Sequence, residues 1–186
     1  EAVRIGAEIF HTLRGILIGK GLNTGVGDEG GFAPELNSNE EAVNLVLQAV
    51  EKAGFEVETQ VSLGLDVAST EFYEQGRYRL AGDGSDYGTE EFIELMSSWI
   101  NRFPIISIED PLAETDWPGW ESITRKHSSD LQLTGDDLFV TNPEVLLKGI
   151  ARGAGNSILV KLNQIGSLSE TLEAIRIAQK NNYGVT

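Results

Sequence analysis

The sequence predicts an α/β fold with a parallel sheet, of the kind that builds (βα) barrels. Short apolar, β-branched runs alternate with segments that carry apolar residues at helical spacing. An ionisable residue stands at the end of each of four such runs, and these residues recur after 43, 27 and 25 residues, at positions 66, 109, 136 and 161. Such intervals are those of successive βα units, whose strands end at one mouth of a barrel.

The first part of the chain predicts two helices around a glycine-rich loop. Residues 2–20 form an amphipathic pattern that Gly21 can end. The loop at 26–34 reads Val-Gly-Asp-Glu-Gly-Gly-Phe-Ala-Pro, which makes Glu29 a candidate proton donor or metal ligand, with an ordinary acidic turn as the alternative. Ser38 and Glu41 then predict a capping box at the start of the next helix.

The rest of the chain repeats strand and helix patterns. Strands are predicted at 61–67, 105–108, 131–135 and 158–160, with a further one from 184. Helices are predicted from Thr89 as the cap, within 114–127, from the Asn-Pro pair at 142, and over 167–182. The polar, glycine-rich residues 72–88 predict a loop or a small hairpin.

Composition limits the classes of function. The chain has 186 residues, enough for one domain with a sizeable core, and its formal net charge of −15 disfavours nucleic acid as a partner. It has no cysteine, which rules out disulfides and thiolate metal sites and fits a reducing compartment. Neither a membrane-spanning run nor a signal peptide is visible. Since the sequence begins without methionine and stops as an apolar run starts, we expect a piece of a longer protein.

The residues at the strand ends predict a metal site. Asp66, Glu109 and Asp136 would converge at one mouth, and three carboxylates are hard ligands that suit Mg²⁺ better than zinc. The alternative is that these acids are helix caps or surface charges. Lys161 at the same mouth would either pair with the acids or, if metal ions favour its neutral form, act as a base opposite Glu29. That set of groups can remove a proton next to a carboxylate and expel a leaving group.

Five stretches resemble the enolase family. They are VGDEGGFAPEL at 26–36, LGLDVASTEFY at 63–73, ISIEDPLAETDW at 106–117, TGDDLFVTNP at 134–143 and LVKLNQIGSLSET at 159–171. They follow the family's order over essentially the whole chain. The resemblance implies a partial TIM-like barrel of the enolase type, with residues 1–186 as an incomplete C-terminal barrel domain that lacks the N-terminal domain and the last barrel units.

The resemblance also implies roles for single residues. It implies Mg²⁺ as the cofactor, and it assigns the following: metal ligands Asp66, Glu109 and Asp136; proton donor Glu29; base Lys161; substrate contacts Glu109, Asp136 and Lys161; supporting residues Asp137 and Gln164. The implied reaction is the glycolytic, Mg²⁺-dependent conversion of 2-phosphoglycerate to phosphoenolpyruvate.

The same resemblance implies a cytoplasmic protein, with cell-surface display as a secondary location, that forms a dimer or larger homo-oligomer. The family's phosphate-binding Ser-His-Arg-Ser stretch is not in the sequence, so we expect these 186 residues alone to be inactive. Two alternatives stay open: another acid/base enzyme of the enolase superfamily, and a non-catalytic fragment that binds a protein partner.

Overall fold

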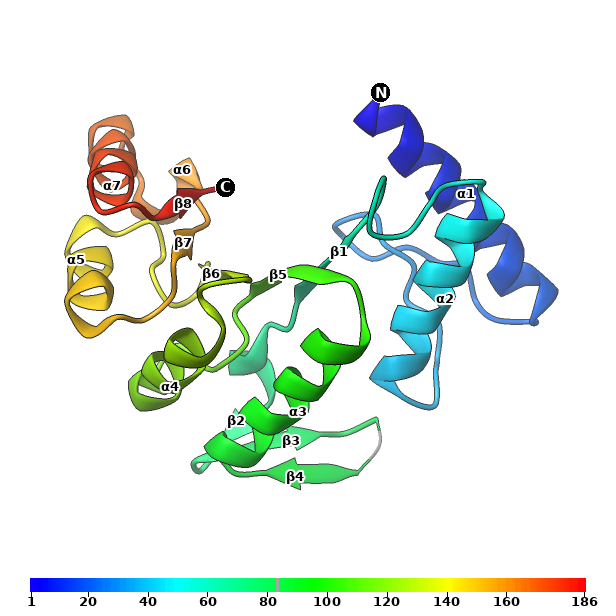
Figure 1. Cartoon of the computed structure of the whole chain (residues 1–186), viewed down its shortest axis with the longest axis horizontal. Coiled ribbons are helices and arrows are strands. Elements are labelled where there is room, and N and C mark those ends of the chain that lie inside the picture. Colours follow the sequence, from blue (N-terminus) through cyan, green and yellow to red (C-terminus); the bar gives the residue numbers. More distant parts are fainter. Residues whose placement is uncertain (83) are drawn as a thin grey trace. The chain divides into compact units, whose positions relative to one another are not determined.

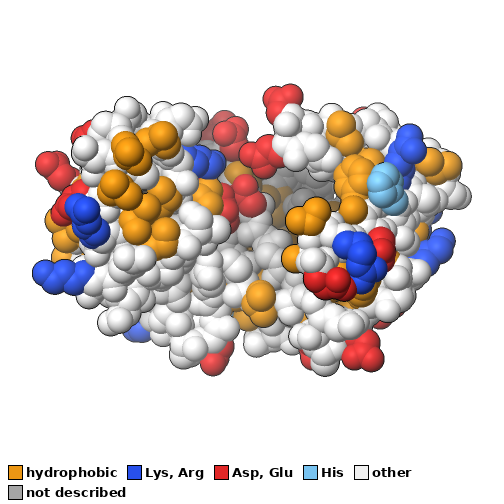
Figure 2. Space-filling model, turned by 90° about the horizontal axis from the view of Figure 1, so that it is seen from above, with side chains coloured by type: hydrophobic (Ala, Val, Ile, Leu, Met, Phe, Trp, Pro, Cys, Tyr) orange, Lys and Arg blue, Asp and Glu red, His pale blue; other side chains and the backbone are white. Residues whose placement is uncertain are grey.

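The computed structural model describes residues 1–82 and 84–186, which form two compact units. Unit 1 comprises Glu1–Ser62 with Leu80–Ser85, and unit 2 comprises Leu63–Arg79 with Asp86–Thr186. Among the described residues, no helix has the length and the apolar character needed to cross a membrane. Acidic side chains are spread over the face seen in Figure 2, as the net charge of −15 would suggest.

Unit 1 is a pair of helices with the glycine-rich loop between them in sequence. Helix α1 spans Ala2–Gly19 and helix α2 spans Asn39–Lys52, close to the predicted bounds. A cluster of buried side chains joins them, and Phe32 of the loop packs against it: Ile16, Leu17, Leu45 and Ala49. The loop closes on itself, because the N–H of Gly27 donates to the carbonyl of Gly31 at 2.8 Å.

The capping box at α2 is only half as predicted. Ser38 Oγ accepts the backbone N–H of Glu41 at 3.2 Å, as expected for an N-cap. The Glu41 carboxylate, however, accepts the N–H of Asn37, one residue before the cap, at 3.0 Å. This contact lowers the pKa of Glu41, since it stabilises the ionised form.

The centre of unit 2 is a five-stranded sheet, and all of its neighbouring pairs are parallel. The order along the sheet is β1 (Leu63–Asp66), β5 (Ile105–Glu109), β6 (Gln132–Gly135), β7 (Ser157–Ile158) and β8 (Gly184–Val185). Strands adjacent in the sheet are also successive βα units in the chain, as in a barrel. The predicted α/β class with a partial TIM-like barrel is confirmed.

The helices that connect these strands lie along one side of the row of strands (Figure 1). They are α3 (Thr89–Arg102), α4 (Trp117–His127), α5 (Pro143–Arg152) and α7 (Leu168–Lys180), with the single-turn α6 (Leu162–Ile165) before α7. Strand residues Ile108, Leu133 and Ile158 are fully buried. Apolar strand side chains covered by helices are the arrangement expected for a parallel sheet.

The insertion between β1 and α3 is more ordered than predicted. It contains a short 3-10 helix (Ser69–Phe72) and a three-stranded sheet of β2 (Tyr73–Glu74), β3 (Arg77–Leu80) and β4 (Ser85–Tyr87). Residue 83, within this segment, lies outside the described residues. The buried ring of Tyr78 stacks on Phe92, with ring centroids 4.5 Å apart. Aromatic packing of this kind anchors the small sheet to α3.

Thr89 does not cap α3, contrary to the prediction. The cap is Gly88, and the Thr89 hydroxyl instead donates to the carboxylate of Asp116 at 2.7 Å. Tyr78 donates to the same carboxylate oxygen at 2.8 Å. Asp116 is 7% exposed and also caps α4 through the N–H of Gly119. The Thr89 hydroxyl is therefore used in a tertiary hydrogen bond to Asp116, and not in capping the helix as the local sequence predicts.

Candidate active site

The register of the sheet brings the predicted acids to one edge. Asp66 on β1 is level with Glu109 on β5, and Glu109 is level with Thr134 on β6. Asp136 follows Thr134 by two residues, so it stands just past the end of β6. The carboxyl ends of parallel strands face one edge, which is why residues far apart in sequence meet here.

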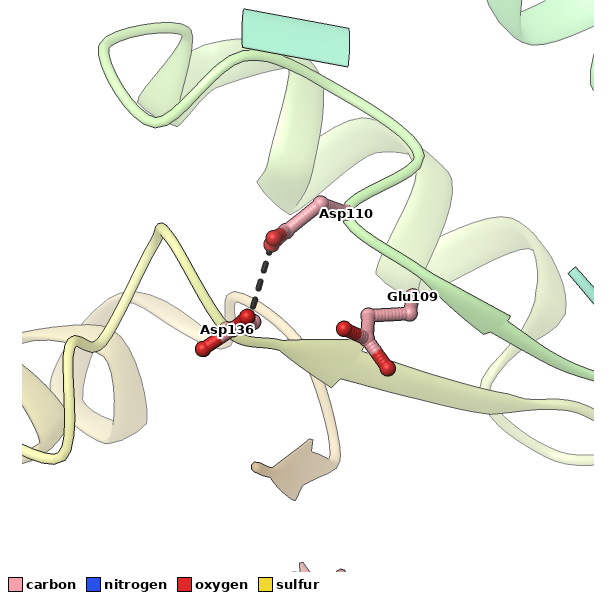
Figure 3. A group of neighbouring side chains, drawn as sticks. All are labelled: Glu109, Asp110 and Asp136. Carbon is pink, nitrogen blue, oxygen red and sulfur yellow. Dashed lines mark hydrogen bonds between the residues drawn. The ribbon is translucent and has the colours of Figure 1, made fainter. Parts of the chain in front are cut away.

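Three carboxylates form the tightest group at this edge (Figure 3). Glu109, Asp110 and Asp136 each offer an oxygen, and these oxygens lie within 4.8 Å of one another. Asp110 and Asp136 are only 3% and 8% exposed. The sequence predicted Glu109 and Asp136 for this place but did not single out Asp110.

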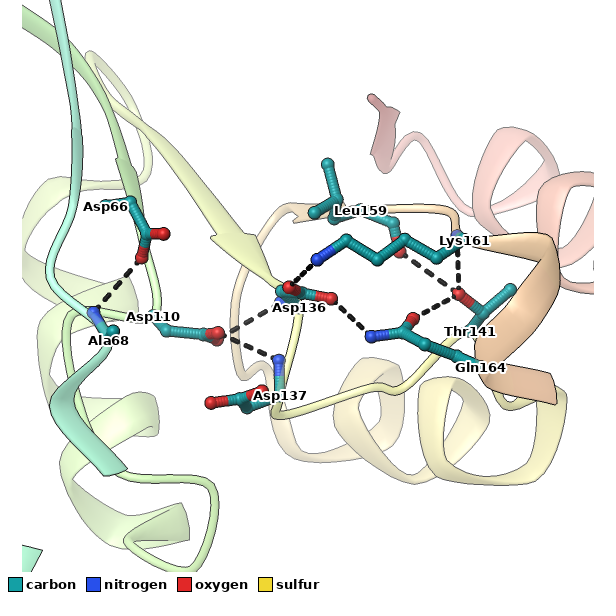
Figure 4. Close-up of polar contacts among 9 residues, drawn as sticks. All are labelled: Asp66, Ala68, Asp110, Asp136, Asp137, Thr141, Leu159, Lys161 and Gln164. Carbon is teal, nitrogen blue, oxygen red and sulfur yellow. Dashed lines mark hydrogen bonds and ion pairs between the residues drawn. The ribbon is translucent and has the colours of Figure 1, made fainter. Parts of the chain in front are cut away.

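Asp66 lies outside that group of three but close to it. Its charge is the second-largest cause, after burial, of the raised pKa of Glu109. Its Oδ1 accepts the backbone N–H of Ala68 at 3.1 Å, and Ala68 has a left-handed φ of 46° (Figure 4). A residue in this sparsely populated region can fix a nearby side chain at the cost of local strain.

The electrostatics of the group fit a bound cation. Burial, with the charges of Asp66 and Asp136, raises the pKa of Glu109 to about 7. Burial also raises the pKa of Asp110 to about 6. Like charges held together out of water are costly, and a divalent cation among them would offset that cost. Because every donor is a carboxylate oxygen, the set suits a hard ion such as Mg²⁺.

Asp110 holds the neighbouring loop in place. Its two carboxylate oxygens accept the backbone N–H groups of Asp136 and Asp137, at 3.1 and 2.8 Å. Its own φ is 39°, a left-handed conformation that favours glycine. The signal in the sequence was the Asp-Pro pair directly after Glu109, which marks the end of the strand.

Two side chains from the C-terminal part of unit 2 reach Asp136 (Figure 4). Lys161 Nζ lies 2.5 Å from Asp136 Oδ2, and Gln164 Nε2 donates to Asp136 Oδ1 at 2.6 Å. The Asp136 side chain is thus held between Lys161 and Gln164, while Asp110 holds its backbone N–H. The structure thus brings Lys161 to one of the predicted acids, while the roles of these residues stay predictions.

The strand before Lys161 is shorter than predicted. Strand β7 ends at Ile158, although Leu159 still donates to the carbonyl of Gly135 at 3.1 Å. Lys161 has extended backbone angles and serves as the N-cap residue of α6, a helix that the sequence did not predict. The extended backbone continues past the regular strand, which carries Lys161 to the edge where the acids lie.

The remaining candidate residues are Asp137 and Glu29. Asp137 is half-buried, and burial followed by the charge of Asp136 raises its pKa. Glu29 lies in the loop of unit 1 and is exposed. Glu29 and Lys161 belong to different units, and their pairing stays a prediction.

A comparison with protein families identifies the domain. The family model described as "Enolase, C-terminal TIM barrel domain" matches residues 1–186. The chain belongs to this family. Membership explains the parallel sheet with acids at its edge and makes the protein a member of the enolase superfamily of lyase- and isomerase-type enzymes. Superfamily enzymes that act on different substrates share this domain, so membership alone does not specify the reaction.

Proposed function

We propose that the chain is part of a phosphopyruvate hydratase, which reversibly dehydrates 2-phosphoglycerate to phosphoenolpyruvate. The observation that carries the proposal is the contact of the Lys161 ammonium with Asp136, at an edge shared with Glu109 and Asp66. A potential base beside a carboxylate cluster is the equipment for removing a proton next to a carboxylate.

Asp66, Glu109 and Asp136 are the residues that would hold Mg²⁺. Asp110 has a different task, because its two oxygens accept the backbone N–H groups of Asp136 and Asp137 and so hold the loop after β6. Bound there, Mg²⁺ would stabilise the negative charge that develops on the substrate carboxylate. Glu109 and Asp136 would then lie against the substrate as well.

Lys161 and Glu29 would carry the two proton transfers. In its neutral form, which bound Mg²⁺ would favour, Lys161 Nζ takes the proton from C2 of 2-phosphoglycerate, and its place beside Asp136 fixes where that proton is received. The C3–O bond then breaks, Glu29 gives a proton to the departing hydroxide, and water and the C2–C3 double bond of phosphoenolpyruvate result. For the next turnover Lys161 must lose its extra proton to water and Glu29 must regain one from water.

Two features favour this reaction over others of the superfamily. The Asp-Glu-Gly-Gly loop at 28–31 and the Lys-Leu-Asn-Gln-Ile-Gly stretch at 161–166 resemble enolase proper. The cytoplasmic location, the homo-oligomer and the small-molecule substrate belong to the same proposal. A non-catalytic protein-binding fragment is the remaining alternative, and it gives no reason for Lys161, Gln164 and Asp110 to converge on Asp136.

The test separates the two proton transfers in the full-length protein. With Mg²⁺ and 2-phosphoglycerate we expect phosphoenolpyruvate to form, and Lys161→Ala should lower kcat by at least about 100-fold. In deuterated water Lys161→Ala should also stop exchange of the C2 hydrogen. Glu29→Gln should block dehydration but retain that exchange, because the first transfer does not need Glu29.

Different outcomes contradict different parts of the proposal. Turnover of a non-phosphorylated 2-hydroxy acid, but not of 2-phosphoglycerate, would move the protein to another superfamily reaction. Exchange that survives in Lys161→Ala and is lost in Glu29→Gln would reverse the two roles.

A further inference from the structure

The loop between β6 and α5 contains two successive residues in a left-handed conformation. Val140 has a φ of 43° and Thr141 a φ of 56°. Both side chains are β-branched, and such residues rarely adopt positive φ because the side chain then crowds its own backbone. Thr141 is fully buried. A strained conformation at a buried residue beside the acids persists only if contacts of that residue stabilise it.

That contact is the Thr141 hydroxyl, which joins two segments of the site (Figure 4). The backbone N–H of Lys161 donates to Thr141 Oγ1 at 2.9 Å. Thr141 Oγ1 lies 2.7 Å from Gln164 Oε1 and 3.4 Å from the carbonyl of Leu159. The left-handed turn aims the hydroxyl at the chain that carries Lys161.

One arrangement of protons satisfies every group in the network of Lys161, Thr141, Gln164 and Asp136. The hydroxyl has a single proton, and it accepts from the Lys161 N–H, so its proton is free to go to Gln164 Oε1 at the shorter distance. Gln164 must then present its NH₂ group to Asp136, which it does at 2.6 Å. The Asp136 carboxylate takes the NH₂ end of the Gln164 amide, and Thr141 holds the Oε1 end in place.

We propose that Thr141 is a positioning residue: it orients the two side chains, Gln164 and Lys161, that donate hydrogen bonds to the Asp136 carboxylate. Through Gln164 it directs one N–H at Oδ1, and through the Lys161 backbone it fixes the origin of the side chain that reaches Oδ2. The proposal rests on the proposed function in taking Asp136 as a metal ligand and Lys161 as the base. Groups that orient a ligand in this way are worth about 10- to 100-fold in metal affinity.

Thr141→Val in the full-length protein tests the proposal. Valine keeps the shape and loses the hydroxyl, which leaves the Lys161 N–H and Gln164 Oε1 without this partner. We expect Mg²⁺ affinity, measured by calorimetry, to fall about tenfold. Hydrogen exchange at the Lys161 amide should become faster by a similar factor, because the N–H loses its acceptor. Thr141→Ser, which keeps the hydroxyl, should restore both values to within about twofold of the wild type.

Thr124→Val is the matched control. Thr124 is also buried, and its Oγ1 also accepts a backbone N–H, that of Gly155 at 2.8 Å. Thr124→Val removes the same kind of hydrogen bond, but at a place away from the acids. Mg²⁺ affinity and hydrogen exchange at the Lys161 amide should therefore stay at wild-type values. In a double-mutant cycle, Thr141→Val and Gln164→Leu should together lose less affinity than the sum of their single losses, since Thr141 acts partly through Gln164.

The outcomes separate this proposal from the proposed reaction. Affinity and Lys161 exchange unchanged in Thr141→Val would overturn the positioning role, as would an equal loss of affinity in Thr124→Val or no recovery in Thr141→Ser. Neither readout needs turnover of 2-phosphoglycerate. Weakened metal binding in Thr141→Val would thus support the positioning role even if the substrate proved to be another acid.

Discussion

At the scale of single residues, the site is organised around Asp136. Its carboxylate receives Lys161 on one oxygen and Gln164 on the other, and its backbone N–H is held by Asp110. Charge-assisted hydrogen bonds of this kind stabilise an ionised carboxylate. The neighbouring acids differ, since burial is the largest influence on each: it raises the pKa of Glu109, and it raises that of Asp110 although Asp110 accepts two backbone N–H groups. The site therefore holds one well-paired carboxylate beside two that favour a proton or a cation.

Glu109 makes a pH-dependent contribution to stability in the metal-free protein. Its pKa in the fold, about 7, is above the ordinary value of 4.5. The folded state thus binds this proton more tightly than the unfolded chain does, so the contribution is fully present below pH 4.5 and is lost as the pH rises through about 7. We expect the stability of wild type relative to Glu109→Gln to fall between about pH 5 and about pH 8.

Urea unfolding in the presence of a chelator measures this difference. Glu144→Gln, at the exposed start of α5, controls for the loss of one charge. Excess Mg²⁺ should flatten the wild-type profile, because the cation replaces the proton. Parallel profiles for wild type and Glu109→Gln would mean that burial does not penalise the Glu109 charge.

At the scale of elements, the turn from β6 into α5 is built on close packing around Phe139. This ring is fully buried, and a Cβ added at Gly135 would lie 2.6 Å from its Cδ2. A Cβ at Gly149 of α5 would clash with Cε1 of the same ring. The two glycines let helix and strand approach the ring closely, which fixes the loop that carries Asp136 and Thr141.

Gly149→Ala should therefore destabilise the protein, although alanine is the better helix former. We expect a loss of about 1–3 kcal/mol from overpacking, larger than the gain of about 1 kcal/mol in helix propensity. Gly15→Ala in α1 is the matched control, since nothing lies within 4 Å of its added Cβ, and it should stabilise the protein by about 0.5–1 kcal/mol. Denaturant unfolding of both variants measures the contrast, and equal effects would show that Phe139 yields to the new methyl group.

At the scale of the whole molecule, a metal that binds only the folded state raises stability. We expect Mg²⁺ at about 100 times its Kd to stabilise the full-length protein by about 2.7 kcal/mol. Asp66→Ala should remove this effect, because it deletes a proposed ligand. Asp130→Ala, which removes one exposed negative charge from a turn, should retain it.

Thermal unfolding with and without Mg²⁺ makes this comparison. An unchanged Mg²⁺ effect in Asp66→Ala would exclude Asp66 from the ligand set. Asp110, the third acid of the close carboxylate group, would then be the next candidate ligand.

The large features of the fold follow from the sequence pattern. Apolar strands alternating with one-faced helices specify a parallel sheet, and parallel strands place their carboxyl ends at one edge. That topology was enough to predict that Glu109, Asp136 and Lys161 meet, without any knowledge of side-chain positions. For the insertion at 72–88 a loop or a small hairpin was predicted, but not its third strand, and the short helix α6 was missed, because these elements are too short to show a period.

The sequence by itself thus determined the fold class and the edge of the sheet at which the acids gather. Only the tertiary structure decided how they are held. Asp110 and Thr141 gain their roles from left-handed backbone conformations, which local sequence disfavours and which the surrounding contacts impose. The raised pKa of Glu109 likewise depends on burial and on charges from other strands, and both exist only once the sheet has formed.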